Sequence, residues 1–92
     1  MRDLPSLNSL RAFDAAGRHL SFNKAALELR VSGSAISHQI KALESWAGTL
    51  LFTRSVRQVF LTAQGEELLR TIQCAFDQIE DGATRMRARN GR

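Results

Sequence analysis

The 92-residue sequence has a single cysteine, a single proline and no long run of apolar residues. With Cys74 alone the chain forms no internal disulfide, so a cytoplasmic location is the default expectation. Pro5 is the one proline, which leaves the rest of the chain free to form long helices. A membrane-spanning helix needs roughly 18 apolar residues in succession, and the N-terminus lacks the basic-then-apolar pattern of a signal peptide. We therefore expect one small soluble domain with no membrane partner.

Positive charge is unevenly distributed along the chain, which has a net charge of +4 and a pI of about 10.6. Residues 1–62 carry eight Lys and Arg against four Asp and Glu, whereas residues 63–92 carry five of each. The basic excess of the first two-thirds suits an anionic partner such as nucleic acid, although many proteins without such a partner share it.

Serine residues mark the predicted starts of three short helices. The predicted N-caps are Ser6, Ser21 and Ser32. The helices are expected at about 7–18, 22–30 and 33–47, with Gly48 as the left-handed residue that ends the third. Apolar residues repeat at helical spacing in each, and Ala25 and Ala26 allow a neighbouring helix to approach the second closely. Trp46 is expected in the core or at a dimer contact.

A β-hairpin is predicted after the third helix. Leu51–Thr53 and Gln58–Leu61 are short, apolar and rich in β-branched and aromatic residues, which is typical of strands. A small polar loop between them is expected to carry Arg54 and Arg57.

The last predicted element is a long helix that begins after Thr62 and runs to about Met86, followed by a frayed basic tail. Apolar residues form a heptad-like seam along it. The predicted dimerisation residues are five residues of this seam together with Phe76, and the full set is Leu68, Ile72, Ala75, Phe76, Ile79 and Ala83. A helix of this length, roughly 36 Å at 1.5 Å per residue, exceeds what one small domain covers. We therefore expect part of the seam to meet a second copy of the chain.

Two helices joined by a tight turn and followed by a basic hairpin predict a mainly α fold, a winged helix-turn-helix. The outer face of the third helix carries side chains suited to base edges in the major groove of DNA. These side chains are Ser34, Ser37, His38 and Lys41. The start of that helix can face a phosphate, and Arg54 and Arg57 can reach phosphates or a narrow minor groove.

Other interpretations remain open at this stage. The polar face of the third helix and the hairpin arginines could simply be solvated, and the seam could belong to a dimeric adaptor that binds an acidic protein. His38 has no neighbours at metal-ligand spacing. No nucleophile, metal set or pair of carboxylates converges, so we expect neither an enzyme nor a cofactor.

Four stretches then give the sequence a clear likeness. "LRAF", "SFNKAALEL", "SAISHQIKALE" and the pattern "LF-R--R---LT--G" occur in order between Leu4 and Met86. Together they resemble the N-terminal domain of LysR-type transcriptional regulators. "LNSLRAF" and "SHQIKALE" are most similar to the branch that contains regulators of glycine cleavage and of chromosomal β-lactamase.

The resemblance implies a DNA-binding domain at 1–62 and, at 63–92, a linker helix with a basic tail that dimerises antiparallel with its mate. A dimer of this kind implies an interrupted palindromic operator in double-stranded DNA. Base-reading positions fall on Ser34, Ser37 and His38, with Ser32 and Lys41 near the DNA backbone. The resemblance further places Ser21 and Asn23 at a phosphate-contacting helix start, and Arg54 and Arg57 on the wing.

Two features depart from the family pattern. Gly33 stands where many members carry a glutamine that can hydrogen-bond a base, so that contact is expected to be absent. Family members also continue beyond the linker helix into a two-lobed domain that binds a small effector. That domain is absent from these 92 residues, so any effector is expected to act only in a full-length parent.

Overall fold

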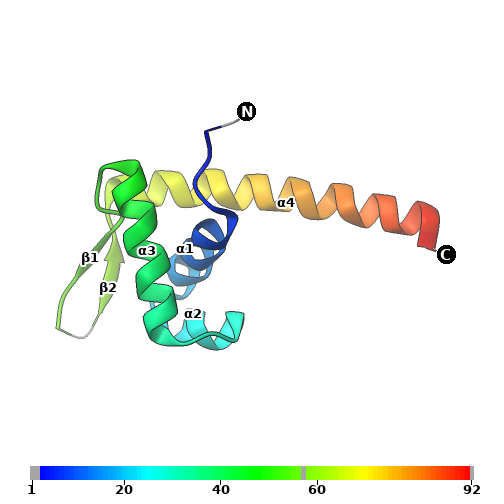
Figure 1. Cartoon of the computed structure of the whole chain (residues 1–92). Helices are drawn as coiled ribbons and strands as arrows, with labels where there is room; N and C mark the ends of the chain where they lie inside the picture. Colours follow the sequence, from blue (N-terminus) through cyan, green and yellow to red (C-terminus); the bar gives the residue numbers. More distant parts are fainter. Residues whose placement is uncertain (1–2, 57, 92) are drawn as a thin grey trace.

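The computed structural model describes residues 3–56 and 58–91. Its elements, in chain order, are α1 (Leu7–His19), α2 (Phe22–Leu29), α3 (Gly33–Ala47), β1 (Phe52–Arg54), β2 (Val59–Leu61) and α4 (Ala63–Gly91). Figure 1 shows α1, α2 and α3 packed together, the hairpin beside α3, and α4 running across one side of this group and projecting beyond it.

The hydrophobic core lies between the first three helices and the start of the hairpin. Its largest fully buried side chains are Phe13, Ile36, Ile40, Leu43 and Leu51. Ala25 and Ala26 are 0% and 7% exposed, which confirms that small side chains on α2 face the neighbouring helices. Trp46, by contrast, is 52% exposed at the end of α3. Of its two expected positions, the core was therefore wrong, and a dimer contact stays a prediction.

The predicted helix starts are confirmed. The hydroxyls of Ser6, Ser21 and Ser32 accept hydrogen bonds from the backbone N–H groups of the third residue along. Gly48 ends α3 in the left-handed region at φ 73°. α1 and α2 end instead at left-handed Leu20 and Arg30, with φ values of 50° and 60°.

The β-hairpin is confirmed as an antiparallel pair with the register Phe52↔Leu61, Thr53↔Phe60 and Arg54↔Val59. Arg54 was expected in the loop but lies in β1. The reason is that the turn closes beyond Arg54, where the backbone N–H of Ser55 donates to the carbonyl of Gln58 at 2.8 Å. Because Phe52 and Arg54 are two residues apart in a strand, their side chains leave the hairpin on the same face.

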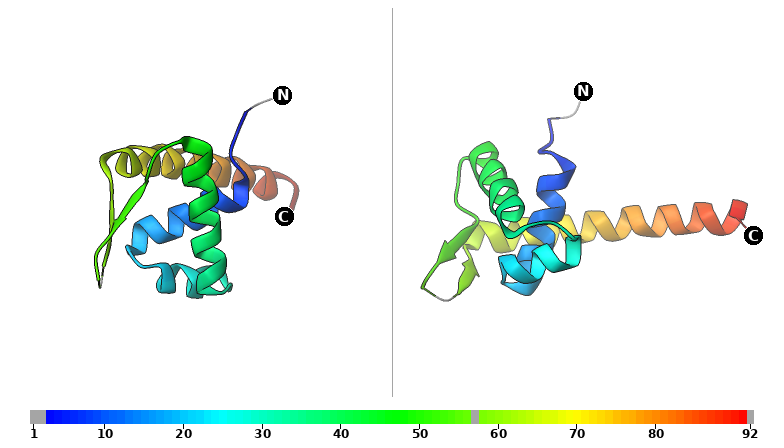
Figure 2. Two further views of the ribbon diagram at one scale, coloured as in Figure 1. Left: turned by 60° about the vertical axis from the view of Figure 1, so that its left-hand side comes forward. Right: turned by 60° about the horizontal axis from the view of Figure 1, so that its bottom comes forward.

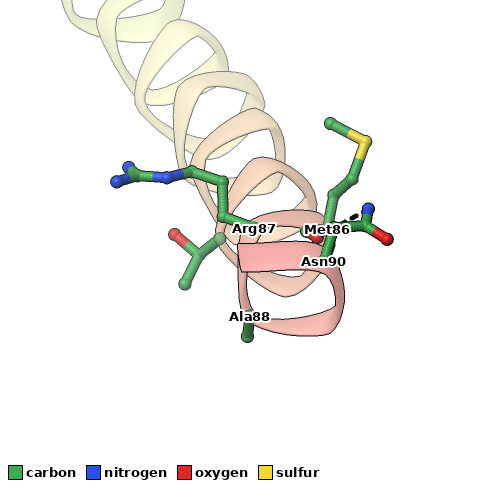
Figure 3. Close-up of a pocket in the computed structure, with 5 residues that line it drawn as sticks. Met86, Arg87, Ala88 and Asn90 are labelled. Atoms are coloured by element: carbon green, nitrogen blue, oxygen red, sulfur yellow. Dashed lines mark hydrogen bonds between the residues drawn. The ribbon is translucent and has the colours of Figure 1, made fainter. Parts of the chain in front are cut away.

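α4 is longer than predicted. It was expected to end near Met86 with a frayed tail, but it continues to Gly91. Arg85, Arg87 and Arg89 lie near its C-terminus, where positive charge is favourable beside the negative end of the helix dipole. The side-chain amide of Asn90 also donates to the carbonyl of Met86 at 3.2 Å (Figure 3).

The first half of α4 belongs to the hydrophobic core. Leu69 and Ile72 are 9% and 5% exposed, and both lie in the same buried cluster as residues of α1 and α3. Two glycines permit the close approach. A Cβ on Gly17 would lie 2.9 Å from Leu69, and one on Gly65 would overlap the carbonyl oxygen of Leu51. The end of α4 instead extends away from the folded body (Figure 2).

Within the described residues, the structure contains no helix whose length and apolarity would let it cross a membrane.

Candidate nucleic-acid interface

α3 carries its apolar and polar side chains on opposite faces. Ile36 and Ile40 are buried at 1% and 0% exposure. The predicted contact residues of this helix lie on the other face, and they are Ser34, Ser37, His38 and Lys41. Ser37 is half-buried and the other three are exposed. The helix therefore presents short hydrogen-bonding groups and one cation along about two turns.

Gly33 and Asn23 lie next to each other where the starts of α3 and α2 meet. A Cβ added at Gly33 would lie 3.4 Å from Oδ1 of Asn23, which is an ordinary contact distance, and Gly33 is not among the residues with positive φ. Neither backbone conformation nor lack of space therefore requires glycine here. Position 33 can accept a side chain that would project beside Asn23.

Two of the predicted contact residues also cap helices. The hydroxyl of Ser32 accepts from the N–H of Ala35 at 3.0 Å and lies 3.1 Å from the hydroxyl of Ser34. The hydroxyl of Ser21 accepts from the N–H of Lys24 at 3.1 Å. Since a hydroxyl that accepts one bond still has a proton to donate, both caps can also donate to a phosphate.

Arg54 lies over the side chain that begins α2. Its guanidinium carbon is 4.7 Å from the centre of the Phe22 ring, a cation–π geometry. Phe22 in turn packs edge-on against Phe52, with ring centres 5.3 Å apart. Ser21, Asn23 and Arg54 help to line a hollow of 290 Å³ between the start of α2 and the hairpin. Arg57 lies outside the described residues.

The starts of α2 and α3 and the tip of the hairpin lie toward the same end of the molecule (Figure 1). α4 crosses the opposite end, and the turned view in Figure 2 shows the same arrangement. We call this end, made of the starts of α2 and α3, the outer face of α3 and the hairpin, the contact surface.

Sequence reasoning missed the residue that joins α3 to the hairpin. The carboxylate Oε2 of Glu44 accepts from the backbone N–H groups of Leu51 and Phe52 at 2.8 and 3.2 Å. Thr62, after which the long helix was predicted to begin, donates from its hydroxyl to the carbonyl of Leu50 at 2.9 Å. Both ends of the hairpin are thus fixed by side chains. Glu44 gave no signal, because a single Glu on a helix flank is typical of a solvated surface.

A charged cluster that the sequence did not reveal joins the ends of α1 and α2. Arg18 donates to both carboxylate oxygens of Glu28 at 3.1 and 2.6 Å, and His19 lies 2.7 Å from Oε1 of Glu28. Hydrogen bonds from Arg18 and then from His19 lower the pKa of Glu28 to about 2. The same pairing with Glu28 raises the pKa of Arg18. In the described part of the chain, no group of three or more His, Cys, Asp or Glu residues is placed to hold a metal ion.

The structure divides the six predicted dimerisation residues into two sets. Ile72 is buried in the core, and Leu68 and Phe76 pack partly against it, so Ile72 has little surface left for a second chain. Exposed positions begin further along α4 and comprise Ala75, Ile79 and Ala83.

Helices α2 and α3 form a helix-turn-helix, and the β-hairpin is the wing beside the polar outer face of α3. This arrangement defines a winged helix-turn-helix protein. The description "Bacterial regulatory helix-turn-helix protein, lysR family" matches residues 7–66. The chain therefore belongs to the LysR family of DNA-binding transcription regulators.

Curated relatives agree with this assignment. The chain is 46% identical over 89 residues to the glycine cleavage system transcriptional activator of Escherichia coli K12, covering 97% of this chain and 29% of that protein. It is 52% identical over 81 residues to the transcriptional activator AmpR of Yersinia enterocolitica, covering 88% and 28%. The chain thus spans less than a third of the length of these relatives, and the first of them belongs to the branch that the sequence indicated.

Solved structures share the fold. Oxidised OxyR of Corynebacterium glutamicum superimposes with a TM-score of 0.87 at 32% identity, over 98% of this chain and 28% of that one. A BenM DNA-binding domain in complex with catB site 1 DNA gives 0.84 at 28% identity, over 90% of this chain and 93% of that one. The winged helix-turn-helix with a long following helix is therefore confirmed.

Proposed function

We propose that this domain binds double-stranded DNA in a sequence-specific manner, with α3 in the major groove and the hairpin against the flanking groove. The observation that carries the proposal is the outer face of α3, where short polar groups and one cation are exposed while the opposite face is buried. An α-helix fits the major groove, and serine and imidazole groups can donate to or accept from base edges. The similarity to a domain in complex with DNA supports this assignment.

Different residues of the contact surface would contact bases and phosphates. Ser34, Ser37 and His38 would read bases. The residues proposed to touch phosphates are Ser21, Asn23, Ser32 and Lys41, with the backbone of Gly33 approaching the DNA. Arg54 would reach the DNA from the wing, as would Arg57. Phosphate contacts hold the protein in register, and base contacts carry the discrimination.

The domain would act as a homodimer through α4, so that two copies of α3 read the halves of an interrupted palindrome. Residues 1–62 would then supply the DNA contacts and residues 63–92 the dimer contacts. Since the DNA of a bacterium lies in its cytoplasm, the domain would act there. Any small-molecule effector would bind only in a longer protein that contains this domain, and the domain itself would need no cofactor.

The test is selection of bound duplexes from a random pool, followed by affinity measurements on the selected operator at several salt concentrations. We expect an interrupted palindrome, and an affinity that falls steeply with salt because phosphate contacts release counterions. His38→Ala should reduce the preference for the operator over random DNA by about 1–3 kcal/mol. Lys41→Ala should weaken binding to the operator and to random DNA alike.

Arg70→Ala is the matched control for Lys41→Ala, because it removes the same charge from an exposed position on α4, away from the contact surface. It should leave DNA affinity nearly unchanged. Absence of salt-sensitive DNA binding at micromolar protein would overturn the proposal and favour an adaptor that binds an acidic protein.

A further inference from the structure

Among residues 3–56 and 58–91, no other element packs against the outer half of α4. Every residue from Asp77 to Asn90 is exposed except Gly82, which is half-buried. Two large apolar side chains lie in this segment, and Ile79 and Met86 are 64% and 61% exposed. Figure 3 shows Met86 projecting outward from the helix, and Figure 1 shows that this end of α4 extends beyond the other elements. A helical segment of this length is marginally stable in water without tertiary contacts. We therefore expect another surface to pack against its apolar face.

The distribution of charge along α4 indicates that this apolar face packs against α4 of a second copy in antiparallel orientation. Up to position 82 the helix carries five acidic residues against one basic residue, Arg70. The acidic residues are Glu66, Glu67, Asp77, Glu80 and Asp81. The following segment carries Arg85, Arg87 and Arg89. Parallel association would place like charges together, whereas antiparallel association places each basic end beside the acidic part of the other helix.

The apolar residues are arranged nearly symmetrically about Ile79. Ile72 and Met86 lie seven residues away on either side, and Ala75 and Ala83 lie four residues away. A two-fold axis through Ile79 would therefore set Ala75 of one copy beside Ala83 of the other, and would place the exposed Met86 at the level of Ile72, which is already buried within its own chain. Such self-complementary pairing is what a two-fold interface requires.

An acidic groove runs beside this face where α4 crosses α1. It has a volume of 480 Å³ and is lined by Asp14, Arg18, Gln73, Phe76, Asp77 and Glu80. Its one cation is already engaged, because Arg18 is bonded to Asp14 at 3.2 Å and to Glu28 at 2.6 Å. The carboxylates of Asp77 and Glu80 are exposed at the groove. The groove therefore has an excess of negative charge beside the apolar face.

Helical geometry selects which arginine faces the groove. At about 100° per residue, Gln73 and Glu80 lie on one flank of Ile79, and Arg87 lies on that same flank. Arg85 and Arg89 lie on the opposite flank. A two-fold axis perpendicular to two antiparallel helices brings the same flank of each together. It also places position 87 within a turn of position 73 on the other chain.

We propose that in the dimer Arg87 of each copy lies in the acidic groove between α1 and α4 of the other copy, so that two symmetric charge contacts set the register of the linker helices. The inference rests on the dimer of the proposed function, and it adds the axis at Ile79 and the acceptor groove. The partner is thus a second copy of this chain, which contributes one side chain to each groove.

The test is the dimer dissociation constant of the 92-residue chain, measured by sedimentation for Arg87→Glu and for the matched control Arg85→Glu. Both variants make the same change of charge in the same turn of α4, but only position 87 faces the groove. Arg87→Glu should weaken the dimer about tenfold at low salt, and Arg85→Glu should stay within about twofold to threefold. Adding Asp77→Arg to Arg87→Glu should recover most of the lost affinity.

The outcomes are distinguishable. Equal weakening by both variants, or no recovery in the double variant, would overturn the groove contact even if the chain remains a dimer that binds DNA. A wild-type chain that stays monomeric at 100 times the protein concentration needed for DNA binding would overturn the groove contact together with the proposed dimer. Circular dichroism of each variant checks that α4 remains helical.

Discussion

The guanidinium of Arg54 lies 4.7 Å from the centre of the Phe22 ring, so the arginine of the hairpin is held by the first residue of α2. Phe22 and Arg54 are 32 residues apart in the sequence, and Phe52 packs edge-on against the same Phe22 ring. The stack links the orientation of the wing to the start of the helix-turn-helix. A wing that is positioned before DNA binds loses less conformational entropy on binding.

Phe22→Leu should therefore weaken DNA binding through its effect on Arg54, although residue 22 is not itself proposed to contact DNA. A cation–π contact at an exposed site contributes roughly 0.5–1 kcal/mol, which corresponds to a loss of about twofold to fivefold in affinity. Fluorescence anisotropy on the selected operator measures it. Because Phe22→Leu also alters packing against Phe52, its effect should be compared in the wild-type and Arg54→Ala backgrounds. A loss of the same size in both backgrounds would show that Phe22 acts through packing alone.

Gly33→Gln should fold normally and change operator preference. The position has no positive φ, and the nearest atom to an added Cβ is Oδ1 of Asn23 at 3.4 Å. A glutamine amide there can form two hydrogen bonds with adenine, worth about 1–3 kcal/mol of discrimination. Selection from a random duplex pool should show one base pair in each half-site that becomes more strongly specified. Identical selected sequences for Gly33→Gln and wild type would contradict the assignment of this position to the contact surface.

Gly65→Ala should destabilise the fold. An added Cβ would overlap the carbonyl oxygen of Leu51, so either α4 or the start of the hairpin must shift. Overpacking of this kind costs about 1–3 kcal/mol, which urea unfolding measures directly. Gly33→Ala is the matched control, because its Cβ has room and glycine in a helix is about 0.5–1 kcal/mol worse than alanine. Equal stability of Gly65→Ala and Gly33→Ala would show that the contact at Gly65 relaxes without cost.

Local signals explain what the sequence predicted well. Ser21 and Ser32 cap helices through residues three positions along, and Gly48 ends α3 through its own backbone freedom. Such interactions depend on adjacent residues, so a single sequence contains them. These signals also predicted the order of helices and wing, the family pattern agreed with that order, and the fold confirms it.

Contacts between distant residues explain what the sequence did not predict. Nothing near Arg54 in the chain indicates Phe22 as its partner, and nothing near Glu44 indicates that its carboxylate accepts two backbone N–H groups from the start of the hairpin. The apolar seam of α4 likewise has one periodic pattern, although its first part packs into the core and its later part is exposed. Only the packing of α1 shows that Ile72 is buried in the core while Ile79 remains exposed.

The bond between Arg18 and Glu28 makes part of the stability depend on pH. The folded-state pKa of Glu28 is lowered from 4.5 to about 2, chiefly by the hydrogen bond from Arg18 and next by that from His19. A lowered carboxyl pKa stabilises the fold at pH values above the unfolded-state value, and this contribution is lost as pH falls through the folded-state value. The stabilisation by Glu28 should therefore be complete above about pH 5 and absent below about pH 2.

Glu28→Gln should accordingly lower the free energy of unfolding at pH 7 and leave it unchanged relative to wild type near pH 2. The Glu28 side chain is 37% exposed, so solvent screening limits the effect, and we expect a loss of about 1 kcal/mol or less despite the bidentate geometry. Urea unfolding of both proteins from pH 2 to pH 7 measures the difference. Glu67→Gln removes an exposed carboxylate from α4 and should give no such pH-dependent difference. If the Glu28→Gln and wild-type curves stay parallel across this range, the pair does not stabilise the fold.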